Sequence, residues 1–485
     1  MEIVECCIRQ SSGNYKTLKM MDKIAVGLDI GTTKIVAVIG RENEHGKIEV
    51  QGIGKAKSLG VNRGVVANIV QTIESIEQAV EQAEQQAELK IRDVVVGIAG
   101  QHIRSTQHSD YINREDAEKI IDDEDIERIK SNVHNLVMMP GEEILHVLPQ
   151  EYRVDSQIDV KDPKGMYGGR LEANFHIVVG QVASIKNVGR CVKQSGLNVK
   201  GITLEPLASA EAVLSPEEKE AGVILVDIGG GTTDVAIFKD GIIRHTAVIP
   251  IGGKIITEDI KEGCEIIEKQ AETLKVRFGS CWPGENSDKE IVSIPGLRGR
   301  EPKEISLKTL SQIIHARMKE IIEAVFQEIR NYGFSESRKR LIAGIVLTGG
   351  GSQLKHLGQL FEYITGMSTR IGYPSEHLAS GSDPELSSPQ YATAIGLVMK
   401  GIADPEIVRA MAVTEEELEV EEAIEASPTP AEVATDQPID TARETSEEPM
   451  DEDEDEKEHE AEHKKKGSFW ERWSKSFLKF LENDV

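Results

Sequence analysis

The chain of 485 residues is poor in cysteine and aromatic residues and has no long apolar run. Its five cysteines form no CxxC pair, which favours free thiols in a reducing compartment over a disulfide framework. Its twelve histidines show no metal-site spacing such as HExxH. No run of eighteen apolar residues is present, so we expect no transmembrane helix. Residues 1–21 do not resemble a secretory signal; we expect a flexible extension, or an upstream start with Met20 or Met21 as the real one.

Negative charge is concentrated in one segment near the C-terminus. Residues 401–463 carry a net charge of −21 out of a total of −27, and they contain no aromatic residue. Such a segment cannot bury enough apolar surface to offset the entropy lost on ordering, so we expect a disordered acidic linker. The acidity therefore says little about the partners of the body, among which we expect no nucleic acid.

The last 22 residues have the opposite character, with a net charge of +3. Phe469, Trp473, Phe477 and Leu481 recur every four residues, so a helix would gather them on one face. Aromatics on one side and cations on the other are typical of a helix lying in the interface of an anionic membrane, although docking on its own domain is the alternative. The residues predicted to bind the membrane are Phe469, Trp470, Arg472, Trp473, Lys475, Phe477, Lys479, Phe480 and Leu481.

The body of the chain contains one pattern twice. KIAVGLDIGTTKIVAVIG (23–40) and GVILVDIGGGTTDVAIFKDG (222–241) each predict two apolar strands joined by a glycine-rich turn with two threonines. Successive N–H groups in such turns form an anion-binding concavity, and glycine lets the backbone approach a ligand. Asp29 and Asp227 are placed to hold a hydrated divalent cation between phosphates. Two ordinary hairpins are the alternative, but the match between the copies favours phosphate binding.

A third glycine-rich segment lies further along. LIAGIVLTGGGSQLKHLGQLF (341–361) predicts a strand, three glycines and an amphipathic helix, with a nucleoside lying against the glycines at the helix N-terminus. A plain strand–helix junction would not need three glycines. Nothing matches GxxxxGK[ST], and neither hairpin runs directly into a helix, so P-loop and Rossmann sites are not expected.

In this order, the three motifs resemble the phosphate-1, phosphate-2 and adenosine loops of the actin and sugar-kinase superfamily, over residues 22–400. Within that superfamily the chain is similar to the FtsA family of bacterial cell-division proteins, which also has a long linker and a terminal amphipathic helix. The matching stretches are SLGVNRGVVANI (58–69), DVVVGIAGQHIRS (93–105), ITLEPLASAEAVL (202–214), AETLKVRFG (271–279) and PQYATAIGLV (389–398). The resemblance implies an α/β fold with two actin-like lobes and ATP with Mg²⁺ in the cleft.

The resemblance also implies roles for single residues, with Asp29 and Asp227 binding Mg²⁺ through water. Glu272 and Lys275 match a pair that contacts ribose and adenine, although alone they would be an ordinary i,i+3 ion pair. Glu205 is the candidate catalytic residue near the attacking water or the metal, or else an acid at a helix entry. The nucleotide-binding residues would be Asp29, Gly31, Thr32, Thr33, Lys34, Asp227, Gly229, Gly230, Gly231, Thr232, Thr233, Glu272, Lys275, Gly349, Gly350, Gly351 and Ser352.

The same resemblance divides the chain into parts. An inserted subdomain (1C) is expected to hold a helix at 117–137 and strands at 143–155 and 171–181. A helix at 306–330 is expected to close subdomain 2B, and its Arg317 and Lys319 are candidate contacts for the tail of the tubulin-like protein FtsZ, or simply solvated. The expected parts are the extension (1–21), 1A (22–103 and 182–220), 1C (104–181), 2A (221–255 and 331–400, with the return to 1A), 2B (256–330), the linker (401–463) and the membrane helix (464–485).

The implied function is an adaptor with at most slow ATP hydrolysis. Head-to-tail self-association would build filaments, and many terminal helices on one filament would bind the membrane by avidity. The filament would anchor the FtsZ ring to the cytoplasmic face of the inner membrane at the division site, and 1C would recruit later division proteins. The alternatives are a sugar or acetate kinase, a heat-shock chaperone ATPase, and a pilus-assembly relative; none of these would be expected to carry the terminal helix after an acidic linker.

Overall fold

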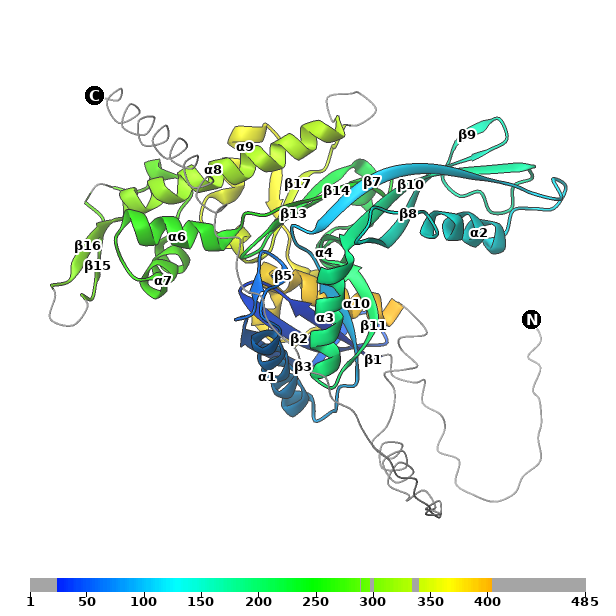
Figure 1. Ribbon diagram of the computed structural model, residues 1–485. Coiled ribbons are helices and arrows are strands. Elements are labelled where there is room, and N and C mark those ends of the chain that lie inside the picture. The colour runs from blue at the N-terminus through cyan, green and yellow to red at the C-terminus, as the bar shows by residue number, and fades with distance from the viewer. Residues whose placement is uncertain (1–23, 288, 297–300, 334–339, 404–485) are drawn as a thin grey trace, which may run out of the picture. The chain divides into compact units, whose positions relative to one another are not determined.

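The structure is a computed structural model that describes residues 24–287, 289–296, 301–333 and 340–403 (Figure 1). All of them belong to the first of two units of the chain, residues 1–420. The second unit, residues 421–485, has no described residue. The N-terminal extension, the linker beyond residue 403 and the terminal helix therefore lie outside the described residues.

Two five-stranded sheets share one topology. In each, three successive strands form an antiparallel meander, and the first of them also pairs in parallel with a strand that follows a long connection. Both predicted hairpins are thereby confirmed, as β1–β2 and β12–β13. The first sheet has the order β11 (Asn198–Leu204), β6 (Asp93–Ile98), β1 (Ile24–Ile30), β2 (Lys34–Glu42) and β3 (Ile48–Lys57). The second has the order β14 (Ile242–Ile249), β13 (Thr233–Lys239), β12 (Val223–Ile228), β17 (Gly344–Thr348) and β18 (Thr369–Ile371).

Helices cover both sheets, and two smaller ladders complete them. The first sheet packs with α1 (Ile69–Ala87) and α3 (Val182–Gln194), and the short strands β4 (Val61–Asn62) and β5 (Val65–Val66) follow β3. The second packs with α6 (Gly253–Gly263), α7 (Glu268–Phe278), α8 (Leu307–Tyr332) and α9 (Leu357–Thr365), and with the ladder of β15 (Ile291–Ile294) and β16 (Lys303–Ser306). We call each sheet with its helices a lobe. Among the described residues, no helix is long and apolar enough to cross a membrane.

Two tightly packed helices join the lobes. A Cβ atom on Gly396 of α10 (Ala392–Ala403) would lie 1.8 Å from the carbonyl oxygen of Ala208 in α4 (Glu205–Val213), so only glycine permits this crossing. A third short helix, α5 (Pro216–Ala221), leads from α4 into β12. One hydrophobic core contains residues of α4, α10 and both sheets, among them Ala25 and Leu225. The base of the cleft is therefore a single packed unit.

An inserted sheet branches from the first lobe between β6 and α3. Its core includes Phe175 and Leu171, and α2 (Asp123–His134) covers it with Ile129 and Val133. Its strands have the order β7 (Ile103–Asn113), β10 (Arg170–Gln181), β8 (Glu142–Val154) and β9 (Gln157–Val160). The helix predicted over 117–137 is shorter, because α2 (Asp123–His134) starts after Asp122, whose carboxylate accepts the Asp125 N–H at 3.2 Å as an N-cap. The subdomain boundaries predicted above remain predictions.

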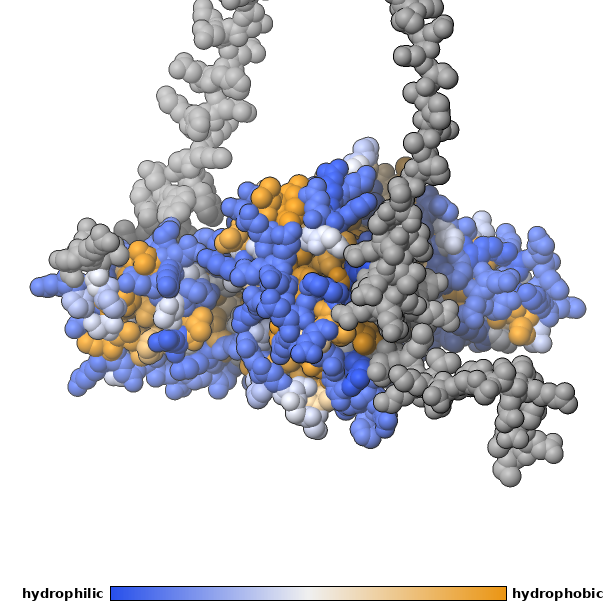
Figure 2. Space-filling model, turned by 90° about the horizontal axis from the view of Figure 1, so that it is seen from below, coloured by the Kyte–Doolittle hydropathy of each residue, from blue (hydrophilic) through white to orange (hydrophobic). Residues whose placement is uncertain are grey.

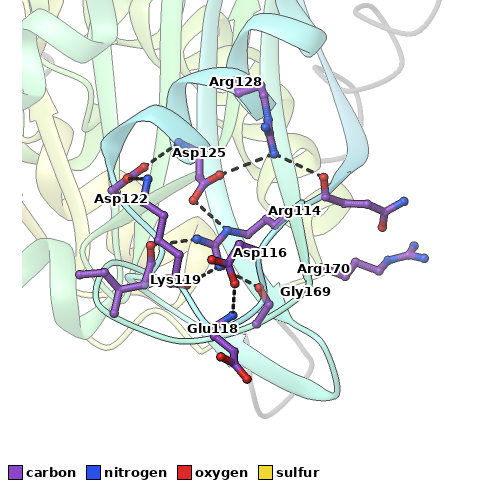
Figure 3. A network of polar contacts seen from close by, with 12 residues as sticks. Arg114, Asp116, Glu118, Lys119, Asp122, Asp125, Arg128, Gly169 and Arg170 are labelled. Atoms are coloured by element: carbon purple, nitrogen blue, oxygen red, sulfur yellow. Dashed lines mark hydrogen bonds and ion pairs between the residues drawn. The ribbon is translucent and has the colours of Figure 1, made fainter.

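Arg114 holds the segment that precedes α2 (Figure 3). Its guanidinium donates to Asp125 Oδ2 and to the carbonyl oxygens of Lys119, Ile120 and Gly168, all at 2.8 Å. The side chain is only 4% exposed. These backbone carbonyl oxygens therefore accept hydrogen bonds from the planar guanidinium instead of from backbone N–H groups of a helix.

We expect Arg114→Lys to loosen this segment without unfolding the body. Lysine keeps the charge but cannot reach four acceptors in one plane, at a cost of about 1–2 kcal/mol. Hydrogen exchange of α2 and the preceding loop should accelerate by roughly 5–30-fold. Arg128→Lys is the matched control, because Arg128 is half exposed and lies 3.6 Å from the same carboxylate. Equal protection in both variants would contradict this role of Arg114.

The inserted sheet also contacts the edge strand of the second sheet. Gln150 Nε2 donates to the carbonyl oxygens of Ile243 and Arg244 at 3.2 and 3.1 Å, and Arg244 forms an ion pair with Glu151 at 2.7 Å. Thr246, which like Arg244 belongs to β14, has its Oγ1 atom 2.8 Å from Nε2 of His176. The insertion therefore covers an otherwise open edge and links the first lobe to the second. The face shown in Figure 2 is largely hydrophilic, with apolar residues in separate patches.

Candidate functional site

A cavity of about 1210 Å³ lies where the repeated hairpins meet. Its lining comes from both hairpin turns, from the glycines after β17, and from α6 and α7. The cavity therefore brings together segments more than 300 residues apart in the chain, including Asp29 and Gly350. Polar and glycine residues dominate the lining, as expected for a site that binds a charged, hydrogen-bonding ligand.

The two glycine-rich turns lie against each other. A Cβ atom on Gly230 would lie 1.8 Å from Thr33 Oγ1, and one on Gly231 would lie 2.5 Å from Thr32 Oγ1. Only glycine allows this approach, which accounts for the extra glycines of the second turn. The first turn is fixed from behind, because Thr32 Oγ1 accepts the Gly64 N–H at 3.0 Å. Threonine hydroxyls and backbone groups of both turns thus surround one small volume.

Four carboxyl groups and one lysine converge on these turns. Burial raises the pKa of Asp29 to about 6, with Lys34 opposing the rise and Asp227 adding to it. Burial and then Asp227 raise the pKa of Asp234 to about 8. The pKa of Glu205 is raised well above its usual value by burial and then by Asp29, Asp234 and Asp227. Burial lowers the pKa of Lys34 to about 8 despite the nearby Asp29. Burial therefore opposes the ionisation of these carboxyls and of Lys34 alike.

Asp227 is oriented by hydroxyl groups from both joining helices. Its Oδ2 accepts hydrogen bonds from Ser209 Oγ in α4 at 2.7 Å and from Thr393 Oγ1 in α10 at 3.3 Å. Burial raises the pKa of Asp227, while these two hydrogen bonds and Lys34 oppose the rise. Oδ2 of Asp227 is thus held by hydrogen bonds within the protein. Oδ1 lies beside the backbone of Gly349, and a Cβ atom added to Gly349 would lie 2.2 Å from it.

The carboxyl groups fit a cation held through other ligands. Within the described part of the chain, no group of three His, Cys, Asp or Glu side chains could hold a metal ion directly. Asp234 Oδ1 is buried without a hydrogen-bond partner among these residues. A hydrated divalent cation, bound through water and phosphate oxygens, would satisfy such groups and relieve their mutual repulsion.

The three glycines after β17 form the opposite wall. Gly349 has φ +80°, whereas a Cβ on Gly350 would meet no atom within 4 Å, so this position opens into the cleft. The predicted order of strand, three glycines and helix is present, but the glycines do not lie at the helix N-terminus, because a 3₁₀ turn spans Gly350–Gln353 and α9 begins only at Leu357. His356, in the left-handed conformation, separates the two. A short turn, rather than the first turn of an α-helix, thus lines the cleft here.

Glu272 and Lys275 lie on the cleft side of α7. Lys275 Nζ is 2.7 Å from Glu272 Oε2 and donates to Thr257 Oγ1 and the Gly253 carbonyl at 2.7 and 2.8 Å. The pair is therefore fixed in a network with α6 rather than solvated as an isolated ion pair. Val276, 72% exposed, follows on the same helix and also lines the cavity. This wall offers both polar and apolar contact area.

The predicted nucleotide-binding residues and Glu205 line the cavity, with two exceptions. Thr233 donates to the Ile251 carbonyl at 2.8 Å, and Ser352 donates to the Gly349 carbonyl at 2.7 Å, so both hydroxyls point into the protein. Sequence reasoning missed Asp234. The repeat itself carries the signal, because Asp234 follows the second Thr-Thr pair where Lys34 follows the first.

Comparison with known proteins gives the family. The family model "Cell division protein FtsA" matches residues 224–396, and "SHS2 domain inserted in FTSA" matches residues 100–179. Cell division protein FtsA of Pseudomonas aeruginosa is 40% identical over 380 residues, which cover 78% of this chain and 89% of that protein. The FtsA of Escherichia coli K12 is 32% identical over 386 residues, covering 78% and 90%. This chain belongs to the FtsA family.

The fold of this FtsA family member is also found in a solved structure. The PilM–PilN type IV pilus biogenesis complex matches with a TM-score of 0.56 and 16% identity, over 79% of this chain and 99% of that one. At this identity the likeness shows the fold alone. The predicted two-lobed, actin-like α/β fold with an FtsA-type insertion is confirmed.

Proposed function

We propose that this FtsA family member is an ATP-binding adaptor that attaches FtsZ polymers to the cytoplasmic face of the inner membrane at the division site. The observation that carries the proposal is the meeting of the two hairpin turns in a cleft lined by Asp29, Asp227, Asp234 and Lys34. Such a cleft fits the polyphosphate of ATP with Mg²⁺. The terminal helix supplies the membrane contact, and it lies outside the described residues.

Different residues of the cleft would bind the phosphates, the cation and the nucleoside of ATP. Thr32 and Thr33 would donate to phosphate oxygens, and Lys34 would neutralise them. Mg²⁺, when bound, would supply positive charge between the phosphates and the buried carboxylates. Glu272 and Lys275 would contact the ribose and base.

The surroundings of Glu205 favour slow hydrolysis while no cation is bound. Burial and three neighbouring aspartates raise the pKa of this carboxyl well above its usual value. A carboxyl that holds its proton cannot accept one from water, so Glu205 would act as a base only when a cation nearby lowers its pKa. ATP would then serve mainly to hold the two lobes in the conformation that self-associates head to tail, and the inserted subdomain would receive later division proteins.

The candidate FtsZ contacts differ in availability. Arg317 donates to both carboxylate oxygens of Asp259 at 2.7 and 2.9 Å and also pairs with Glu320. Lys319 is 56% exposed, and Glu323 lies 4.0 Å away. An acidic peptide would have to displace Asp259 to reach Arg317, but it could reach Lys319 directly.

We therefore expect Lys319→Glu to weaken binding of an FtsZ tail peptide by roughly 2–5-fold at low salt, since a rim charge contributes about 1 kcal/mol or less. Lys186→Glu, the same charge change on the exposed face of α3, is the matched control. Fluorescence anisotropy at two salt concentrations checks the result, because screening should shrink the effect. An equal loss in both variants would assign it to net charge rather than to α8.

Sedimentation with anionic liposomes tests the proposal as a whole. The full chain with ATP should pellet and carry FtsZ with it, whereas a chain ending at His463 should leave both in the supernatant. The full chain with Trp473→Glu and Phe477→Glu is the matched control, because it keeps the length and disrupts only the apolar face. If the full chain stays soluble with liposomes present, the adaptor function is wrong and the phosphotransferase alternative comes to the front.

A further inference from the structure

Ser58 is a polar residue of the cleft that none of the three motifs contains. It directly follows β3, lines the cavity, and is 8% exposed. Its hydroxyl oxygen is buried and has no hydrogen-bond partner within the described residues. A buried hydroxyl without a partner is unfavourable, so such a group in a cleft points to a ligand that bonds it.

The position of Ser58 is fixed by the first hairpin turn. Its backbone N–H donates to the Thr33 carbonyl at 3.1 Å. The same loop is held a few residues later, where the Gly64 N–H donates to Thr32 Oγ1 at 3.0 Å. The backbone of Ser58 is therefore held against the turn whose two threonines are predicted to bind phosphate, so the residue is positioned before a ligand binds.

The α7 wall and the two hairpin turns present different side chains to the cleft, and this difference orients a bound ligand. Exposed apolar side chains, Ile267 and Val276, line the wall that belongs to α7 and its start in the second lobe. The part of the cleft around the two hairpin turns presents threonine hydroxyls and Lys34, with Lys57 beside Ser58, although lysines line the second-lobe wall as well. A nucleotide would place its base on the apolar surface of α7 and its phosphates between the two hairpin turns, on the side where Ser58 lies.

We propose that the Ser58 hydroxyl donates a hydrogen bond to the terminal phosphate of a bound nucleoside triphosphate. This inference rests on the proposed nucleotide site, and it adds a preference of that site for the triphosphate over the diphosphate. A diphosphate lacks the group that Ser58 would bond, so the buried hydroxyl stays without a partner when a diphosphate is bound. Ser58 thereby favours the triphosphate over the diphosphate.

Titration calorimetry of the full chain with ATP and with ADP, both with Mg²⁺, tests this inference. Ser58→Ala should weaken ATP binding by about tenfold or more and change ADP binding by less than about twofold, because a hydrogen bond to a charged group contributes about 1.5–3 kcal/mol. Ser388→Ala is the matched control. Its hydroxyl oxygen is also buried without a partner within the described residues, but Ser388 does not line the cavity. This variant should bind both nucleotides as the wild type does.

The outcomes separate the inference from the proposed function. Equal weakening of ATP and ADP, or no change for either, overturns the role of Ser58 while nucleotide binding stands. A wild type that binds neither nucleotide overturns the proposed function and this inference together. Ser58→Thr, which keeps the hydroxyl, should retain the preference for ATP, and its loss in that variant would show that packing rather than the hydrogen bond sets the selectivity.

Discussion

Gly350→Asp is expected to reduce ATP affinity by about a hundredfold or more while the protein stays folded. A side chain at this position would meet no atom within 4 Å, so the aspartate points into the cleft rather than into the core. There it would occupy the space of the nucleoside and add a carboxylate to a site that already holds Asp29, Asp227, Asp234 and Glu205. Calorimetric titration with ATP and Mg²⁺ measures the loss, and circular dichroism checks the fold.

Two neighbouring substitutions make this experiment specific. Gly350→Ala adds only a methyl group in open space and should bind ATP within a few-fold of the wild type. Gly349→Ala should instead destabilise the fold, because Gly349 has φ +80° and its Cβ would lie 2.2 Å from Asp227 Oδ1. Undiminished ATP affinity in Gly350→Asp would show that the nucleoside does not lie on this wall.

The sequence predicted the cleft because its defining signals are local. An apolar strand, an aspartate, glycines and two threonines specify a hairpin with a functional turn, whatever the rest of the chain does. Because the same motif occurs a second time around Asp227, the copy around Asp29 could be interpreted as part of a binding site rather than as an ordinary hairpin. The pairing of the two turns could be expected only because both copies belong to one known arrangement of lobes.

What the sequence did not reveal depends on contacts between distant segments. Thr232 and Thr233 are neighbours in one motif, but Thr233 begins β13 and its hydroxyl donates to the Ile251 carbonyl, so only Thr232 lines the cleft. Ser352 follows three open glycines yet bonds back to Gly349. Ser58 becomes part of the site only because its loop docks on the first hairpin. Neither the hydrophobic periodicity nor the composition of the local sequence shows which of these hydroxyl groups line the cleft.

The insertion contacts the start of α4, which carries Glu205, as well as the edge of the second sheet. His146 of β8 accepts the Leu204 N–H at 3.0 Å, immediately before Glu205 begins α4. Burial lowers the pKa of His146 to about 4, so the ring is neutral and can accept this bond at physiological pH. Gln150 on the same strand holds the edge of the second sheet. The inserted sheet is therefore hydrogen-bonded both to Leu204, which directly precedes the candidate catalytic carboxyl, and to the second lobe.

The pH dependence of stability should expose the charge buried in the cleft. Asp234 is buried, and its pKa is raised from 3.8 to about 8 by burial and then by Asp227, with the Thr232 hydrogen bond opposing the rise. Between these two pH values the folded state keeps a proton that the unfolded state has released. The free energy of unfolding therefore falls as pH rises through this window and levels off above about pH 8.

Asp234→Asn removes this titration and keeps an acceptor for the Thr232 hydroxyl. Thermal melts at low pH should nearly coincide, and the variant should become progressively more stable than the wild type as pH rises. Each pH unit within the window contributes up to about 1.4 kcal/mol to the difference. Asp110→Asn, at a partly exposed position of β7, controls for the loss of one negative charge and should show no such divergence. Parallel curves for wild type and Asp234→Asn would mean that Asp227 or Asp29 holds the proton, and the cation would then have to be assigned to a different pair of carboxylates.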